Sequence, residues 1–180
     1  MLDTEKIIRK YYEPGSQLYH ILVEHSLRVR DKALAIAARK PELQLDTEFI
    51  AEAAMLHDIG IFMCYAPGIA CNGTHKYIEH GYLGADLLRK EGLPRHALVC
   101  ERHTGVGLTL KTIVENKLPL PRRDMLPLSG EEKLICYADK FFSKSKLNEE
   151  HRVEAIRNEL AKYGEYQLEV FDSWHSLYTE

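Results

Sequence analysis

The sequence lacks any apolar segment long enough to cross a membrane, because none of its hydrophobic runs approaches the roughly 20 residues that span a bilayer. The N-terminus, MLDTEKIIRK, also lacks the apolar core of a secretory signal. The formal net charge is only −3, so neither sign dominates and nothing attracts the whole protein to nucleic acid or to an anionic membrane. These absences predict a cytoplasmic protein without a membrane or nucleic-acid partner.

Cysteine is also scarce, with four residues in 180 and no CxxC pair among them. The four are Cys64, Cys71, Cys100 and Cys136. This number and spacing favour reduced thiols over a disulfide framework or a zinc-thiolate site. Any metal site would then need nitrogen and oxygen ligands.

The alternation of apolar and polar residues that is typical of strands is missing, as are internal repeats and low-complexity linkers. Apolar residues instead recur at spacings near three and four, the helical period. The length and this pattern predict a single all-α domain over residues 1–180. The helices are expected at residues 4–12, 16–40, 46–59, 77–90, 94–103, 108–116, 129–147, 149–163 and 165–177.

Histidine is abundant, with nine residues in the chain, and several lie at helix ends or on apolar faces. A lone buried histidine is usually a core residue, and an adjacent His-Asp pair alone favours an ordinary helix terminus. An aspartate inside the apolar segment ICYADKFF, however, needs a partner, because a buried unpaired charge is very costly. Six such positions on five helices together favour a metal site: His25, His57, Asp58, His80, His103 and Asp139.

The order H…HD…H…H…D resembles the HD-domain metal-dependent phosphohydrolase superfamily, and in particular its small stand-alone HDIG-type members. The resemblance lies in EHSLRV around His25, LHDIG around His57-Asp58 and YADKF around Asp139, and it spans about residues 16–146. It implies a helical bundle of the HD type, with additional C-terminal helices over residues 148–178.

The resemblance also implies the ligand sets. A first ion would be bound by His25, His57, Asp58 and Asp139. A second would be bound by Asp58, His80 and His103, as in the members that hold two metals. Asp58 would bridge the ions, and Asp58 and His57 would be the catalytic residues. Imidazole and carboxylate ligands suit divalent Fe, Mn, Co, Ni or Zn.

The implied function is a phosphomonoesterase or phosphodiesterase that acts on a nucleotide or a related small phosphate ester through a metal-activated hydroxide. The small dinucleoside tetraphosphate hydrolases share the same ligand order. Two alternatives stay open. HD-type oxygenases with a mixed-valent di-iron centre use the same six ligands, and a non-catalytic nucleotide-binding protein could keep the fold. The sequence gives no indication of the oligomeric state.

Basic residues near the ligands favour hydrolysis over oxygenation. The candidates for binding a substrate phosphate are Arg28, Lys140, Lys144 and Arg122, although each could equally be a solvated surface charge. Arg122 and Arg123 lie in a proline-rich segment that could cover the site. Many relatives carry a lysine directly after HDIG, where this chain has Ile61. His75 competes with His80 as a ligand, and structural or surface roles are expected for His20, His96, His151 and His175.

Overall fold

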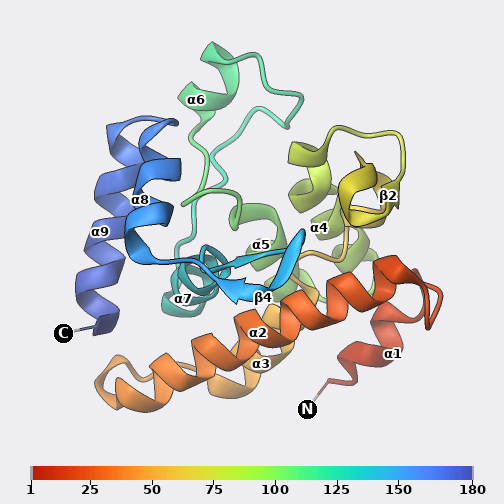
Figure 1. Cartoon of the computed structure of the whole chain (residues 1–180), viewed down its shortest axis with the longest axis horizontal. Helices are drawn as coiled ribbons and strands as arrows, with labels where there is room; N and C mark the ends of the chain where they lie inside the picture. Colours follow the sequence, from red (N-terminus) through yellow and green to blue (C-terminus); the bar gives the residue numbers. More distant parts are fainter. Residues whose placement is uncertain (1, 180) are drawn as a thin grey trace.

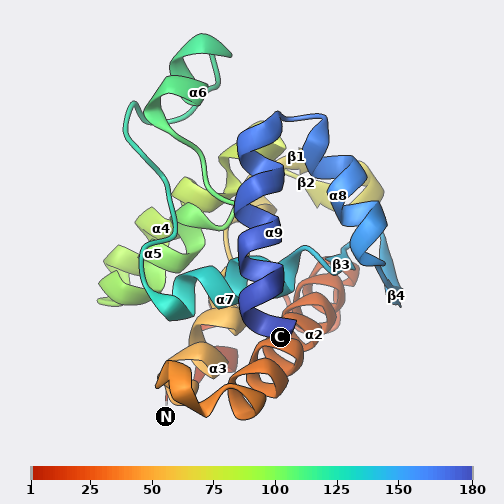
Figure 2. The same ribbon diagram turned by 90° about the vertical axis from the view of Figure 1, so that its left-hand side faces the viewer.

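The computed structural model describes residues 2–179, so the end residues 1 and 180 of the predicted domain lie outside the described part. The all-α class is confirmed, since helices dominate the described chain and its sheets are two-stranded (Figures 1 and 2). No helix in this part is long and apolar enough to cross a membrane. The α-helices are α1 Thr4–Ile8, α2 Gln17–Arg39, α3 Thr47–Leu56, α4 His80–Lys90, α5 Pro94–Arg102, α6 Leu110–Glu115, α7 Gly130–Asp139, α8 Val153–Ala161 and α9 Glu165–Thr179.

The long helix α2 runs along the lower edge of the molecule in Figure 1, in orange. Ser16 starts it, because its hydroxyl oxygen accepts a hydrogen bond from the Tyr19 amide at 3.1 Å. Its buried face packs against α3 and α7. His25 lies on that face between Leu22 and Val29, both fully buried. The same apolar periodicity that makes the helix amphipathic therefore carries one histidine into the interior.

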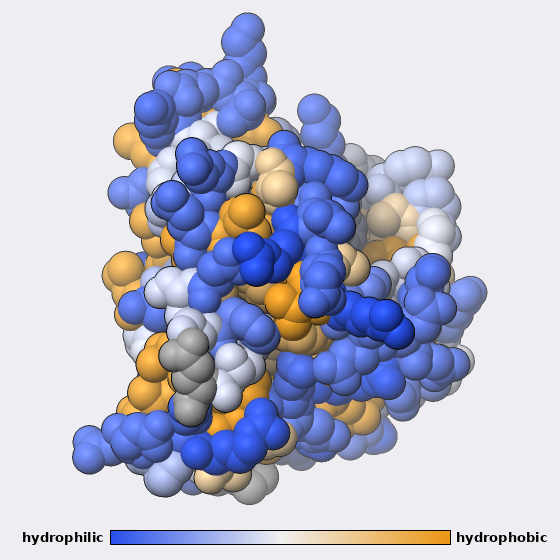
Figure 3. Space-filling view, turned by 60° about the vertical axis from the view of Figure 1, so that its left-hand side comes forward, coloured by the Kyte–Doolittle hydropathy of each residue, from blue (hydrophilic) through white to orange (hydrophobic). Residues whose placement is uncertain are grey.

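Two clusters of buried apolar residues meet along α2 and α3. One contains Val29 and Ala54, and the other contains Leu22 and Leu56. His25 therefore lies in sequence where α2 passes from one cluster to the other, and His57 follows the corresponding change in α3, between Ala54 and Met55, by two residues. On the face shown in Figure 3, hydrophobic residues appear as separate patches among hydrophilic ones, and α6 stands apart from the other helices in Figures 1 and 2.

The LHDIG turn packs directly on the start of α4. A Cβ atom on Gly60 would lie 2.2 Å from the His80 carbonyl oxygen and 2.6 Å from the Gly84 amide nitrogen. Only glycine permits this contact between two backbones. The close approach brings Asp58, two residues before Gly60, beside the first residue of α4.

The structure corrects the predicted helix at residues 129–147. Helix α7 starts as expected at the Ser129 capping box but ends at Asp139, and the chain then forms a hairpin. Its strands are β3 Phe142–Ser143 and β4 Lys146–Glu150, paired antiparallel. Arg28 of α2 fixes this hairpin by donating hydrogen bonds to the Leu147 and Glu149 carbonyl oxygens. The polar segment SKSKLNEEH has no apolar face that would bury a helix.

Smaller corrections concern the segment before α4 and the first helix. Residues 61–75, expected as a loop, contain the short antiparallel pair β1 Tyr65–Ala66 and β2 Cys71–Asn72, with 3₁₀ turns at Ile61–Met63 and Pro67–Ile69. The first helix ends at Ile8 rather than near residue 12. The predicted helix at 77–90 begins with a 3₁₀ turn, Tyr77–Glu79, before α4. The C-terminal helices, expected from residue 148, begin only at Val153, because β4 continues to Glu150.

Candidate metal centre

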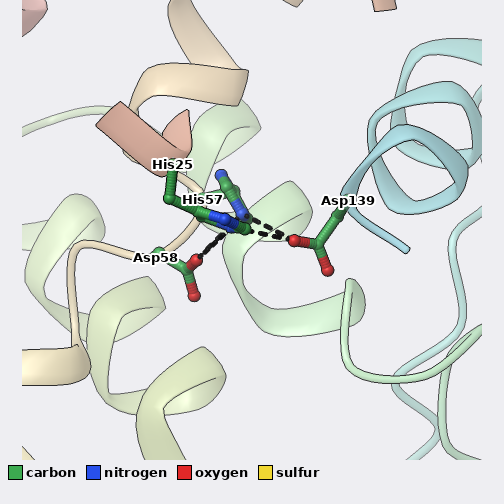
Figure 4. A group of neighbouring side chains, drawn as sticks. All are labelled: His25, His57, Asp58 and Asp139. Carbon is green, nitrogen blue, oxygen red and sulfur yellow. Dashed lines mark hydrogen bonds and ion pairs between the residues drawn. The ribbon is translucent and has the colours of Figure 1, made fainter. Parts of the chain in front are cut away.

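The six predicted ligands converge in the interior. His25 comes from the middle of α2, His57 and Asp58 directly follow α3, His80 opens α4, His103 directly follows α5, and Asp139 ends α7. All six side chains are buried, from 0% exposed for His57 and Asp58 to 9% for Asp139. Figure 4 shows four of them pointing toward one another. Helix ends allow this convergence, because side chains there can turn inward without interrupting a helical ladder.

The first group contains His25, His57, Asp58 and Asp139. The Nε2 atom of His25 lies 3.1 Å from Asp58 Oδ2 and 3.0 Å from Asp139 Oδ1. The Nε2 atom of His57 lies 3.0 and 3.4 Å from the same two oxygens. Two imidazoles and two carboxylates thus direct one atom each at a common point.

The second group contains Asp58, His80 and His103. Here the other Asp58 oxygen, Oδ1, lies 3.3 Å from His80 Nε2 and 3.4 Å from His103 Nε2. The two Nε2 atoms are 3.0 Å apart. Asp58 therefore presents one oxygen to each group.

Backbone carbonyls fix the orientation of three of the histidine rings. The Nδ1 atoms of His57, His80 and His103 donate hydrogen bonds to the carbonyl oxygens of Ala54, Tyr77 and Cys100, at 2.7, 2.6 and 2.7 Å. In the neutral form each ring then has its proton on Nδ1 and a lone pair on Nε2. Burial lowers the pKa of His57, but Asp58 and Asp139 together raise it to about 9, so without a bound cation this ring also carries a proton on Nε2. The same second hydrogen bond orients most metal-binding histidines in proteins.

This tautomer leaves the facing Nε2 atoms of His80 and His103 as two lone pairs at 3.0 Å. Burial lowers the pKa of both rings, that of His80 to about 3 despite the neighbouring Asp58, so neither gains a proton near neutral pH. Two facing acceptors repel each other unless a cation lies between them and the Asp58 oxygen. The donor set therefore fits a divalent metal ion.

The environment of Asp58 also favours a bound cation. Its side chain is completely buried, and neither oxygen has a hydrogen-bond partner of good geometry within the described residues. Burial alone would raise the pKa of Asp58, but the charges of Lys144 and His57 hold it well below its usual range. A buried, ionised carboxylate needs a compensating positive charge or coordination to a metal ion. The Lys144 ammonium supplies one such charge, at 2.5 Å from Oδ2.

The four predicted phosphate-binding residues divide into two pairs. Lys140 and Lys144 lie at the centre, with Lys140 Nζ 3.0 Å from Asp139 Oδ2 and Lys144 Nζ beside Asp58. Arg28 is engaged with the hairpin backbone and lies over the Phe142 ring at 5.2 Å. Arg122 is exposed. The structure thus brings the two lysines to the ligands, whereas Arg28 contacts the hairpin and Arg122 is exposed.

A cavity of about 710 Å³ opens next to Asp139, Lys140 and Lys144. Its wall includes Tyr77 and His151, which the sequence does not mark as site residues. The Tyr77 ring stacks on His80, with ring centroids 4.8 Å apart. No sequence signal marks Tyr77, and the sequence predicts a structural or surface role for His151.

His75, the competitor of His80, lies outside both groups, with its Nδ1 atom 3.3 Å from Glu79 Oε1. His96 and His175 have the structural roles expected of them. His96 contacts Glu52 at 3.2 Å, and His175 lies 2.8 Å from the Tyr137 hydroxyl.

The fold and this centre define an α-helical domain with a buried histidine–aspartate site suited to divalent metal ions. A family model described as "HD domain" matches residues 22–143, and the chain belongs to this family. The expected resemblance to the HD-domain metal-dependent phosphohydrolase superfamily is thereby confirmed. The match ends inside the β3–β4 hairpin, so most of that hairpin, α8 and α9 lie beyond it.

Among curated proteins, an uncharacterized protein of Methanocaldococcus jannaschii is 39% identical over 121 residues, which cover 66% of this chain and 64% of that protein. The tRNA (cytidine(56)-2'-O)-methyltransferase of Thermoplasma volcanium is 30% identical over 145 residues, or 80% of this chain and 38% of the relative. The enzyme of the same name in Picrophilus torridus is 30% identical over 128 residues, which cover 71% of this chain and 33% of that relative. The chain thus spans less than two thirds of each of these relatives. No solved structure matches significantly.

Proposed function

We propose that the protein is a phosphohydrolase that uses two divalent transition-metal ions to cleave a small phosphate ester. The single observation that carries this proposal is the position of Asp58, whose two oxygens each face a separate group of histidines. A carboxylate placed in this way is suited to bridge two ions. Bound divalent ions supply Lewis acidity that polarises a phosphoryl group and acidifies a water molecule.

The chain's own residues would divide the remaining work. His57, His80 and His103 are held by backbone carbonyls, so their Nε2 atoms are aimed before any ligand binds. Lys140 and Lys144 lie beside the carboxylates, line the cavity and would hold the oxygens of the substrate phosphate. Their charge would also offset the negative charge that develops during phosphoryl transfer.

The alternative of an HD-type di-iron oxygenase uses the same six ligands, so the ligands do not separate the two reactions. The two lysines favour hydrolysis, because an ester phosphate needs cationic partners beside the metal ions. The tRNA methyltransferase names of two relatives give a reason to include RNA ends among the candidate esters. A non-catalytic nucleotide-binding role is disfavoured by the complete ligand set.

The test is a panel of phosphate esters assayed in anaerobic buffer after loading with Mn, Fe(II), Co, Ni or Zn. The panel holds nucleoside monophosphates, cyclic nucleotides, dinucleoside polyphosphates, sugar phosphates and short RNAs with terminal phosphates. We expect phosphate or nucleoside release with at least one metal, and loss of this activity in Asp58→Ala. The control Asp86→Ala, which changes an exposed aspartate of α4, should keep the activity of the wild type. Oxygen consumption with an organic substrate, and no ester cleavage by metal-loaded protein, would refute the proposal.

A further inference from the structure

The cavity beside the metal centre is built by two different parts of the chain. Asp139, Lys140 and Tyr77 come from the region matched by the HD family model. A second wall comes from the hairpin, the segment after it and α8, and includes His151, Ala155 and Ile156, which follow that region. Figure 2 shows α8 passing in front of the yellow segment that carries β1 and β2, and both line the cavity. The second wall is therefore a feature of this chain beyond the family match.

Charge is distributed unevenly around this cavity. Its two cationic side chains, Lys140 and Lys144, both lie against the carboxylates of the metal centre. From α8, the apolar residues Ile156 and Leu160 and the carboxylate of Glu159 line the cavity. A second or third phosphate extending toward α8 would meet apolar carbon and a negative charge. An organic group there would instead bury apolar surface, which is favourable.

His151 is the polar exception on this wall. Its backbone amide donates a hydrogen bond to the Phe141 carbonyl oxygen at 2.8 Å. This bond holds His151 beside Phe141, which follows Asp139 by two residues in the sequence. Its side chain is half-buried and lines the cavity. Within residues 2–179 its imidazole makes neither a hydrogen bond nor an ion pair, whereas those of His75, His96 and His175 do. The ring is thus free to contact a ligand.

We propose that this pocket selects a substrate with a single phosphate attached to an apolar body the size of an aromatic ring or nucleobase, and that His151 and the α8 wall bind that body. The proposal rests on the proposed function and narrows it, because it disfavours polyphosphate chains, including dinucleoside polyphosphates. The volume of about 710 Å³ lies in the range of small-molecule pockets. His151 would donate a hydrogen bond to a polar edge of the body, while the two lysines hold the phosphate.

The test is a substitution on α8 that fills part of the pocket. Ala155 lines the cavity and is exposed, so Ala155→Phe adds volume there without touching the core. Asn158→Phe is the matched control, since Asn158 is an exposed residue of the same helix that does not line the cavity. The probes are 1-naphthyl phosphate, glycerol 3-phosphate and inorganic tripolyphosphate. We expect the wild type to prefer 1-naphthyl phosphate in kcat/KM over both other probes.

In Ala155→Phe, we expect kcat/KM for 1-naphthyl phosphate to fall by about tenfold or more, while that for glycerol 3-phosphate changes less than about twofold. Asn158→Phe should resemble the wild type. His151→Ala should raise KM for a nucleoside monophosphate with little change in kcat, which is the signature of lost ground-state binding. The control is His20→Ala, an exposed histidine of α2. Equal loss for both esters in Ala155→Phe, or preferred cleavage of tripolyphosphate, would overturn the inference.

A binding measurement separates this inference from the proposed function. The hydrolysis-resistant analogue 1-naphthylphosphonate is titrated into metal-loaded wild type, Ala155→Phe and Asn158→Phe by calorimetry. If no ester is hydrolysed but the phosphonate binds the wild type and Asn158→Phe at least about tenfold more tightly than Ala155→Phe, the pocket assignment stands and the reaction is wrong. If esters are hydrolysed and the three proteins bind the phosphonate equally, the reaction stands and the pocket assignment fails. Absence of phosphonate binding to the wild type also refutes the pocket assignment.

Discussion

Replacing Lys144 by methionine tests whether its ammonium group and a metal ion serve the same carboxylate. Lys144 Nζ lies 2.5 Å from Asp58 Oδ2, and Asp58 is completely buried. At an effective dielectric constant of about 20, two unit charges at this distance attract each other by ~6–7 kcal/mol before the desolvation of both groups is subtracted. Removing one partner of a buried pair costs ~3–5 kcal/mol, because the other charge is left uncompensated.

We therefore expect Lys144→Met to lower the melting temperature of the metal-free protein by ~6–20 °C, at ~2–4 °C per kcal/mol for a chain of this size. Added divalent metal should remove most of the difference, because the ions then supply the positive charge that Asp58 needs. The assay is thermal unfolding with a chelator and with saturating Mn or Zn. Lys146→Met is the control, since Lys146 is an exposed lysine on the same hairpin.

Two results would refute this reasoning. An equal loss of stability with and without metal would mean that Lys144 supports the fold through packing rather than through the charge of Asp58. An unchanged melting temperature in the presence of the chelator would mean that the Lys144–Asp58 contact does not contribute to stability.

Three further predictions follow from the geometry. His103→Ala should reduce bound metal from two ions to one by elemental analysis, because it removes a ligand of the second group alone; one ion in both proteins would count against a binuclear centre. Gly60→Ala should lower the free energy of unfolding, measured by urea titration, by more than ~2 kcal/mol and should weaken metal binding, because the added Cβ would collide with the start of α4. The control Gly68→Ala has open space around it and should leave the free energy of unfolding unchanged. Burial lowers the pKa of His96 in the folded protein, although Glu52 opposes this shift. The unfolded chain therefore binds a proton at His96 more readily than the folded protein does. The free energy of unfolding should then fall as the pH drops below about 6.5, the ordinary pKa of histidine. His96→Gln should therefore lose less stability between pH 7 and pH 5 than the wild type does, and an equal loss would contradict this.

The helices and most of the ligand positions could be predicted from the sequence, because both depend on the local pattern of apolar residues. Helical periodicity is a local property, and it placed His25 on a buried face of α2 beside Leu22 and Val29. Asp139 was recognised because a carboxylate in an apolar segment requires a partner. The six ligands could be grouped only through the resemblance to a known family, because their contacts join residues as far apart as His25 and Asp139.

The hairpin and the pocket could not be predicted in this way. The segment after Asp139 is polar and has no strand alternation, and Arg28 holds it from 119 residues away. Helical periodicity therefore predicts a helix to residue 147, whereas α7 ends at Asp139. The same turn decides that Lys144 points at Asp58 and that His151 lines the cavity, so the role of either residue depends on a tertiary contact. Tyr77 is positioned by its stacking on His80, which spacing in the sequence does not reveal.

The central claim is that Asp58 bridges two metal ions, and anomalous diffraction from crystals soaked in Mn or Zn tests it most directly. We expect two anomalous peaks ~3.5–4 Å apart, one on each side of the Asp58 carboxylate. The first should lie among His25, His57 and Asp139, and the second between His80 and His103. A single peak, or two peaks that do not share Asp58, would contradict it.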